Sequence, residues 1–309
     1  MANQYMAAYS LNPRVYVDNL DASIEFMATR PDTYLDELGQ FFHPVMADST
    51  SWKMSTVGSV IDLPKENEDE DDLPASVPAT GYDKTFSLVN YRQKVQITDT
   101  FARADRFGKA QQMAGGLPNS CRRLKEYLRA AIFANAFTSG TGSDSAYMIA
   151  NSHAPENPRG SARDNLTTGA LDYSNWHAMR LLADQQKDEL GNAMPGDIKT
   201  LLVPSALRQV AVELQTTKLQ PYTAMNTAKV LTDFNVVVGH YLTSSAAWFG
   251  FTDRSGVDKG MFYVHLVDED IKDVKPSDNA DIVWAQRVKT ICTFGFSQAI
   301  DYVYGSTGA

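Results

Sequence analysis

One group of side chains in this sequence comes nearest to a cluster of metal ligands that includes a histidine. His265 is followed by three carboxylates, Asp268, Glu269 and Asp270, at the end of a predicted strand. A metal site needs at least three converging ligands, and this group has enough donors to supply them. Carboxylates also gather in turns for hydration alone, and we interpret the group as such a solvated turn. A metal-dependent hydrolase with His265 and Asp268 as ligands is kept as a minor alternative.

Other patterns that indicate catalysis are missing from the sequence. It contains no Walker phosphate loop, no GxSxG nucleophile elbow and no HExxH pair. The glycine-rich segment Ser139–Ser143 follows a predicted helix instead of a strand, which favours a linker over a phosphate-binding loop. The five histidines are spread along the chain, one per segment: His43, His153, His177, His240 and His265. The sequence therefore predicts a protein that is not an enzyme and has no metal site and no cofactor.

Acidic and basic side chains are strongly segregated. The run ENEDEDD carries six carboxylates in seven residues, namely Glu66, Glu68, Asp69, Glu70, Asp71 and Asp72. Residues 103–129 carry seven basic side chains against two acidic ones. Runs of like charge stay extended and hydrated, so the acidic run is either a solvated loop tip or a binding site for a basic surface. Both interpretations are open at this point.

Length and composition describe an ordinary folded protein of 309 residues, 43% of them hydrophobic. At about 150 residues per domain, this length predicts roughly two domains. The net charge of −9 argues against a general nucleic-acid binder. The two cysteines, Cys121 and Cys292, form no CxxC pair and are interpreted as reduced, buried thiols. The amino terminus does not resemble a signal peptide, and no apolar run approaches the roughly 20 residues that cross a bilayer, so we expect no membrane insertion.

The first half of the chain predicts an arm, a hairpin and a helix. Residues 1–49 mix short helical stretches with turn formers. Two stretches with alternating side chains, Trp52–Ile61 and Thr85–Ile97, flank the acidic run, and we interpret residues 50–97 as one long projecting hairpin. A helix is predicted over 118–138, opened by Pro118, and a long connection follows up to residue 169.

The second half alternates between helix and strand. Helices are predicted at Tyr173–Leu190 and Pro204–Lys218, on either side of a buried strand at Ile198–Val203. The remaining apolar stretches predict strands, at Asn235–Gly239, Ala246–Phe251, Met261–Val267, Ala280–Thr293 and Ile300–Tyr304. This alternation suggests an α/β region within the second half. For the whole chain, with its long hairpin and terminal strands, the predicted fold class is α+β.

This order of parts resembles the major capsid protein of tailed bacteriophages, the Hong Kong ninety-seven shell fold. The segment Asn151–Gln215 and the later NVVVGHYLTSSAAWFGF (residues 235–251) are similar to the axial domain of its Mu-type branch. The resemblance implies five parts: an N-terminal arm (1–49), an extended hairpin loop (50–97), a peripheral domain with a spine helix at 118–138 (98–169), an axial domain (170–270), and return strands of the peripheral domain (271–309).

The resemblance also implies a function. Copies of the chain would self-assemble in the host cytoplasm into hexamers and pentamers of an icosahedral shell, the virion capsid, around double-stranded DNA held without sequence-specific contact. A portal protein is the implied partner, and separate scaffold and decoration proteins are further candidates. The alternative is an encapsulin-like nanocompartment shell that encloses an enzyme cargo.

A hairpin alone buries too little surface to stay ordered in water, so we expect it to lie across a neighbouring subunit. Our hypothesis is that the six acidic residues of 66–72 meet basic residues of that neighbour. Each exposed ion pair contributes only about 0–1 kcal/mol, but a shell repeats it many times. The basic candidates are Arg103, Arg106, Arg122, Arg123 and Arg129.

Overall fold

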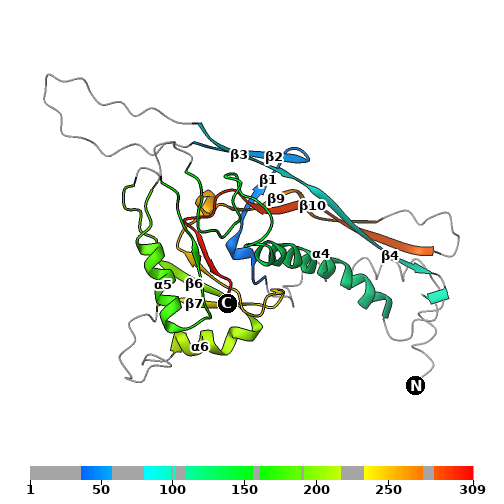
Figure 1. The fold of residues 1–309 in the computed structure, drawn as a ribbon. Coiled ribbons are helices and arrows are strands. Elements are labelled where there is room, and N and C mark those ends of the chain that lie inside the picture. Colours follow the sequence, from blue (N-terminus) through cyan, green and yellow to red (C-terminus); the bar gives the residue numbers. More distant parts are fainter. Residues whose placement is uncertain are drawn as a thin grey trace.

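Two β-sheets and one long helix organise the chain, which confirms the predicted mixture of helix and sheet (Figure 1). The computed structural model describes residues 36–57, 80–98, 100–101, 109–155, 161–188, 191–216, 233–273 and 282–308. The acidic run and most of the predicted arm lie outside these residues.

The first sheet has four strands in the order β1-β9-β10-β4. Their bounds are β1 His43–Met46, β9 Met261–Asp273, β10 Ile282–Phe296 and β4 Val89–Thr98. β1 runs parallel to β9, and the other neighbours are antiparallel. The long helix α4 (Lys109–Ala134) packs on one face of this sheet, where Leu117 and Cys121 contact Val288 of β10. Both cysteines are buried and unbridged, as predicted.

The projecting hairpin is shorter than the predicted one. β2 (Ser51–Val57) pairs with β3 (Thr80–Ser87) in a separate two-stranded sheet, whereas residues 89–98 form β4 and pair with β10. The prediction of one hairpin over 50–97 is therefore wrong for its last ten residues. The alternation that predicted a strand is real, since Ile97 is buried and Tyr91 half-buried. Alternation shows that a segment is a strand, but it does not show which strand is the partner.

The helix also differs from its prediction at its start. α4 begins at Lys109, nine residues before the predicted first residue, and contains Pro118 in its interior. A proline is favoured in the first helical turn because its missing N–H has no partner there, which is why the sequence placed the start at Pro118. The helix ends at Ala134, four residues before the predicted end, in turns that run to residue 138.

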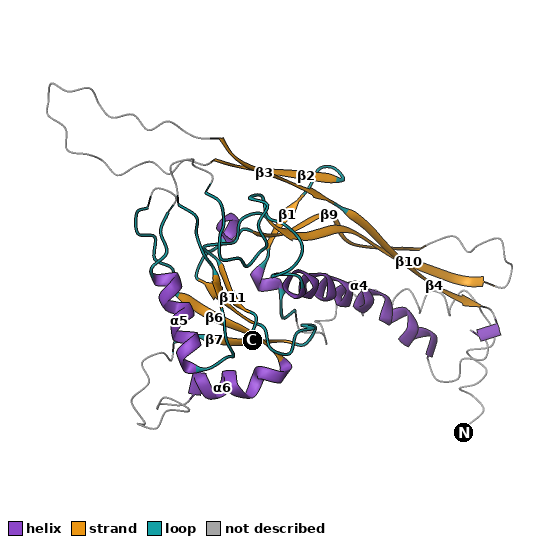
Figure 2. Cartoon of the chain, viewed as in Figure 1, coloured by secondary structure: helices purple, strands orange, loops and turns teal. Residues whose placement is uncertain are grey.

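The second sheet has five strands in the order β5-β11-β8-β6-β7. Their bounds are β5 Leu166–Thr167, β11 Val303–Ser306, β8 Trp248–Thr252, β6 Ile198–Pro204 and β7 Asn235–Gly239. Helices α5 (Tyr173–Asp184) and α6 (Arg208–Thr216) lie beside this sheet (Figure 2). Trp176 of α5 and Leu214 of α6 share one buried cluster with Leu201 and Trp248 of the sheet. The other face carries Leu202 and Phe249, so the central strands are buried on both sides.

The two sheets do not follow the predicted domain boundary at residue 270. β9 was assigned to the axial part, 170–270, but lies in the first sheet with β1 and β10. β11 was assigned to the return strands, 271–309, but pairs with β8 and β5 in the second sheet. The final residues therefore cross from one sheet to the other, so a single cut at residue 270 does not separate the two sheets.

A short segment joins the two sheets. The 3₁₀ turn η1 (Gly39–Phe41) precedes β1, and the ring of Phe41 stacks on Phe251 of β8 with 3.9 Å between centroids. The same ring meets the edge of Phe133 in α4. A second 3₁₀ turn, η3 (Gly256–Lys259), precedes β9. It is capped by Gly260, whose φ of 64° is in the left-handed region, and β9 begins at the next residue.

Candidate functional site

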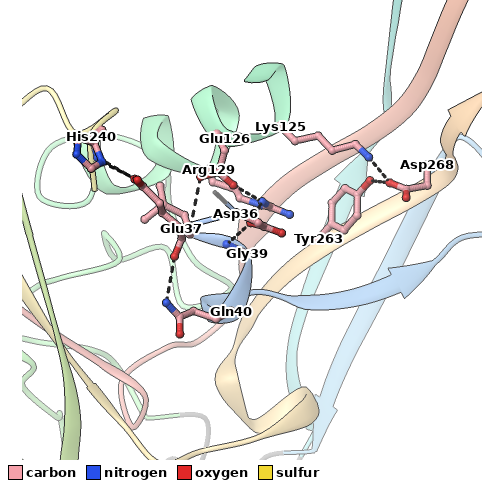
Figure 3. A network of polar contacts seen from close by, with 11 residues as sticks. Asp36, Glu37, Gly39, Gln40, Lys125, Glu126, Arg129, His240, Tyr263 and Asp268 are labelled. Atoms are coloured by element: carbon pink, nitrogen blue, oxygen red, sulfur yellow. Dashed lines mark hydrogen bonds and ion pairs between the residues drawn. The ribbon is translucent and has the colours of Figure 1, made fainter. Parts of the chain in front are cut away.

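A cluster of charged side chains surrounds the segment Asp36–Gln40, where the chain passes between α4 and the second sheet (Figure 3). We call this cluster the junction. Arg129 of α4 lies at its centre, with a side chain only 9% exposed. Its guanidinium contacts the carboxylates of Asp36 and Glu126. Glu126 and Arg129 can meet because residues three apart lie on the same face of a helix.

Glu126 is buried beside this guanidinium and also accepts a hydrogen bond from the backbone N–H of Leu38 at 3.3 Å. Burial and a hydrogen bond with Asp36 raise the pKa of Glu126 to about 7, against the lowering effect of the Arg129 charge. Removing a carboxylate from water disfavours its charged form, so a single arginine shared with Asp36 does not restore the ordinary value. The junction therefore contains a carboxyl group that changes charge near neutral pH.

Two further elements contact the segment Asp36–Gln40: the end of β7, through His240, and η3, through Lys259. The backbone N–H of His240, which follows β7, donates to Glu37 at 3.0 Å, and its ring Nδ1 lies 2.5 Å from the same carboxylate. Lys259 of η3 donates to the backbone carbonyl of Gln40. A Cβ on Gly39 would come within 2.6 Å of the Asp36 carboxylate, so any other residue there would displace this carboxylate from its present position. Three distant parts of the chain thus converge on five residues.

A second ionic contact ties α4 to β9. Lys125 is buried, and its Nζ lies 2.5 Å from Asp268, which also accepts a hydrogen bond from the Tyr263 hydroxyl. Partial burial opposes ionisation of Asp268, but the hydrogen bonds from Lys125 and Tyr263 outweigh it and lower the pKa of this carboxyl. Burial and the neighbouring carboxylate raise the pKa of Tyr263.

The contact between Lys125 and Asp268 shows that our interpretation of residues 265–270 as a solvated turn is wrong. Residues 265–270 do not form a solvated turn but lie inside β9, where the register with β10 shifts. Asp268 and Glu269 turn towards α4, the latter 3.7 Å from Arg122, whereas Asp270 pairs with Lys272. Within the described residues, no three histidine, cysteine or acidic side chains lie close enough to hold a metal ion.

The structure separates the arginines of the predicted intersubunit contact. Arg103 and Arg106, like the acidic residues 66–72, lie outside the described residues. Arg123 is exposed on α4, and Arg122 is half-buried beside Glu269. Arg129 is buried within its own subunit and does not reach the surface, because the helix turns this residue inward to Asp36.

A third buried polar group was missed from the sequence. His153 places Nδ1 2.6 Å from Asp144 and Nε2 3.1 Å from the side-chain oxygen of Asn165. Asn165 is fully buried and donates to the carbonyls of Met148 and Val303. These hydrogen bonds hold the long connection after α4 against β11. Spacing of nine and twelve residues in an irregular segment matches no helix or strand period, so the sequence carried no signal for them.

These clusters position segments of the chain. Each joins side chains from elements that are far apart in the sequence, and each is buried or half-buried. Together with the two sheets and the long helix, they define a subunit whose folded parts are fixed by ionic contacts at their boundaries. No helix in the described part of the chain is long and apolar enough to span a membrane.

Comparison with known proteins identifies this class of subunit as a viral shell protein. The chain belongs to the family described as phage capsid protein, whose model matches residues 81–296, more than two thirds of the sequence. The protein is therefore a structural component of a phage virion. No curated protein matches the sequence.

Solved structures share the fold at low identity. The capsid of cyanophage P-SCSP1u is 13% identical with a TM-score of 0.56, and the mature capsid of bacteriophage PhiM1 is 9% identical with a TM-score of 0.56. Each match covers 90% of this chain and 88% of the other. The virus-like particle from Pyrococcus furiosus is 11% identical with a TM-score of 0.50, and covers 94% of this chain and 99% of that one. The predicted capsid identity is confirmed by the family, and the shell fold by these structures; the Mu-type branch stays a prediction.

Proposed function

We propose that this capsid protein self-assembles into the hexamers and pentamers of an icosahedral head around double-stranded DNA. Assembly takes place in the host cytoplasm, with a portal protein as partner and separate scaffold or decoration proteins as further candidates. The DNA is held without sequence-specific contact, which agrees with a net charge of −9. Membership in the phage capsid family is the observation that carries this proposal.

The two-stranded hairpin supports self-association. Among the described strands, β2 and β3 pair only with each other, so each has one edge without a partner among them, and an isolated two-stranded sheet is marginally stable in water. Trp52 and Phe86 anchor it on Phe262 of β9. Contacts from a neighbouring copy would stabilise the rest. We therefore assign residues 50–87 as the extended loop and residues 1–42 as the arm, which ends where β1 enters the first sheet. The first sheet with α4 is then the peripheral domain, and the second sheet with α5 and α6 is the axial domain.

The predicted ionic contact between the acidic run and a neighbouring subunit is part of this proposal, with four of the five arginines first chosen. The acidic residues of 66–72 would meet Arg103, Arg106, Arg122 or Arg123 of a neighbour. Arg129 is left out because it is buried between Glu126 and Asp36 of its own subunit.

An encapsulin-like shell with an enzyme cargo is the second candidate. The observation in its favour is limited to the shell: the fold likeness to the virus-like particle from Pyrococcus furiosus extends over 99% of that chain. The family match favours the phage capsid.

Electron microscopy and sedimentation velocity of the expressed full-length chain, at low and high salt, test the proposal. We expect closed polyhedral shells or capsomer rings that weaken as salt rises. A monomer at every salt concentration, with or without added scaffold, would overturn it. Nucleic acid in particles from the phage supports the head, and a packaged enzyme would support the second candidate.

A further inference from the structure

A basic surface crosses three strands of the first sheet. Lys94 of β4 is paired in register with Arg287 of β10, which is paired with Lys272 of β9. The neighbouring row contains Arg92, Lys289 and Asp270 in the same order. We call these two rows the basic strip. Five of its six side chains are cations, in a chain whose net charge is −9.

The strip lies on the face of the sheet that points away from α4. Val288 and Ile271 belong to the cluster that packs against the helix, and directly paired residues point to the same face. Their neighbours in sequence, Lys289 and Lys272, therefore point to the opposite face. The ion pairs of Asp270 with Lys272 at 3.2 Å and Arg287 at 3.9 Å confirm that these three share that face.

The cations of the strip are accessible. Arg92 and Lys94 are exposed, and the side chain of Lys272 is 63% exposed. Asp270, itself 25% exposed, pairs with two of the five cations. Like charges placed directly opposite each other on neighbouring strands repel, so the row of Lys94, Arg287 and Lys272 destabilises the isolated subunit. A polyanionic partner would remove that cost.

We propose that the basic strip is the docking surface for the acidic run Glu66–Asp72 of a second copy of this chain. The inference rests on the proposed self-assembly, and in it the basic strip replaces the arginines of α4 as the partner surface of the acidic run. Six carboxylates in seven residues complement the excess positive charge of the strip.

Chain length favours a second copy over the same copy. Val57 and Thr80 are adjacent across the hairpin, and the 22 residues between them reach at most about 36–40 Å when doubled back at full stretch. β3 and β4 follow one another as one long band across the molecule (Figure 1). At about 3.3 Å per residue, Arg92 and Lys94 lie roughly 40–46 Å from Thr80 along this band. The tip of the loop could touch the near end of the strip, but the run could not lie across it.

The spacing of charges fits an extended run laid along the strands. Alternate residues of an extended chain point to the same side, about 6.6–6.8 Å apart. Glu66, Glu68, Glu70 and Asp72 follow this period. The cations of each strand, Arg92 with Lys94 and Arg287 with Lys289, are also two residues apart. Two carboxylates that are two residues apart would therefore lie opposite the two rows of the basic strip.

Peptide binding to the full-length, unassembled subunit tests this docking directly. The probe is a fluorescent peptide of residues 62–76, followed by anisotropy at low salt. We expect Lys94→Glu with Arg287→Glu to weaken its binding at least tenfold. Arg123→Glu, which tests the alternative contact with α4, should change it less than twofold, and so should the control Arg208→Glu at an exposed position of α6. A neutral peptide with Gln and Asn in place of the six acids should not bind. Equal effects of the strip and helix variants would overturn the proposal.

Assembly of the whole chain gives the second readout. Reversal of the strip should raise the concentration needed for assembly, and adding Glu68→Lys and Glu70→Lys to the same chain should restore it. Failure of this charge swap would contradict the pairing. If a DNA oligonucleotide binds the strip more tightly than the peptide, or reversal reduces only the DNA content of particles, the partner is DNA and the proposal is wrong. Peptide binding by a chain that never assembles would reject the proposed function alone, whereas assembly without peptide binding would reject this inference alone.

Discussion

The guanidinium of Arg129 and the carboxylate of Asp36, 93 residues apart in the sequence, form an ion pair between α4 and the segment that enters the first sheet. The arginine is buried, and its guanidinium lies over the rings of Tyr263 and Phe294 at 5.8 and 5.3 Å. This pair holds the segment Asp36–Gln40 against the long helix. It also explains why one of the candidate surface arginines cannot reach a neighbouring subunit.

Replacing Arg129 with Met should destabilise the unassembled subunit by about 3 kcal/mol, because it leaves Glu126 buried without its positive partner. Urea unfolding at pH 8 measures the effect. Arg123→Met, at an exposed position of the same helix, should change the free energy of unfolding by no more than about 0.5 kcal/mol. A cost below 1 kcal/mol for the Arg129 variant would show that the buried pair contributes little.

Glu126 should make the stability of the subunit depend on pH. Its pKa is raised in the folded state from 4.5 to about 7, so the folded state binds a proton that the unfolded state releases. Stability from this group is therefore present below pH 4.5 and lost as the pH rises through 7, by roughly 2–3 kcal/mol. Between pH 5 and pH 8, the free energy of unfolding should fall more for the wild type than for Glu126→Gln. Parallel pH profiles would contradict this assignment.

Asn165→Ala should cost about 3 kcal/mol, because the substitution leaves the carbonyls of Met148 and Val303 and a ring nitrogen of His153 without their partner. Thermal or urea unfolding measures the loss. Asn151→Ala, at an exposed position of the same connection, serves as the matched control and should be nearly neutral. Equal stability of the two variants would argue against a structural role for this buried amide.

His240→Ala should loosen the segment Asp36–Gln40 without unfolding the subunit. The contact with Glu37 is largely exposed on the histidine side, so we expect an effect of about 0.4–1 kcal/mol, or about two- to fivefold faster local exchange. Hydrogen exchange of residues 36–42, followed by mass spectrometry, measures it. His177→Ala, in α5, should leave this exchange unchanged. If both variants behave alike, the Glu37 contact does not hold the segment.

Local patterns predicted several elements at nearly their observed bounds. The strand Ile198–Val203 is observed as β6, Ile198–Pro204, and the strand Asn235–Gly239 is observed as β7 without change. These segments are short apolar runs rich in β-branched residues, which is the local signature of a buried strand. Bounds were less accurate where a residue suits two positions, as with Pro118, which lies inside α4 instead of opening it.

Pairing between segments could not be predicted in the same way. β3 and β4 are separated by one residue, yet the first pairs with β2 and the second with β10. Of the arginines chosen from the sequence, Arg123 is exposed and Arg129 is buried, since six residues along a helix change the face that a side chain occupies. Charge density in the sequence does not distinguish them.

Residues that are close along the chain are enough to predict the mixture of helix and strand, the order of parts that resembles a capsid subunit, and the acidic character of residues 66–72. The row formed by Lys94, Arg287 and Lys272 could not be predicted in this way, because sheet pairing brings together residues up to 193 positions apart. The same pairing places Asp268 beside Lys125 and Asp270 on the opposite face of the sheet. Two residues apart in a regular strand, these side chains would share a face, but the register shift in β9 separates them.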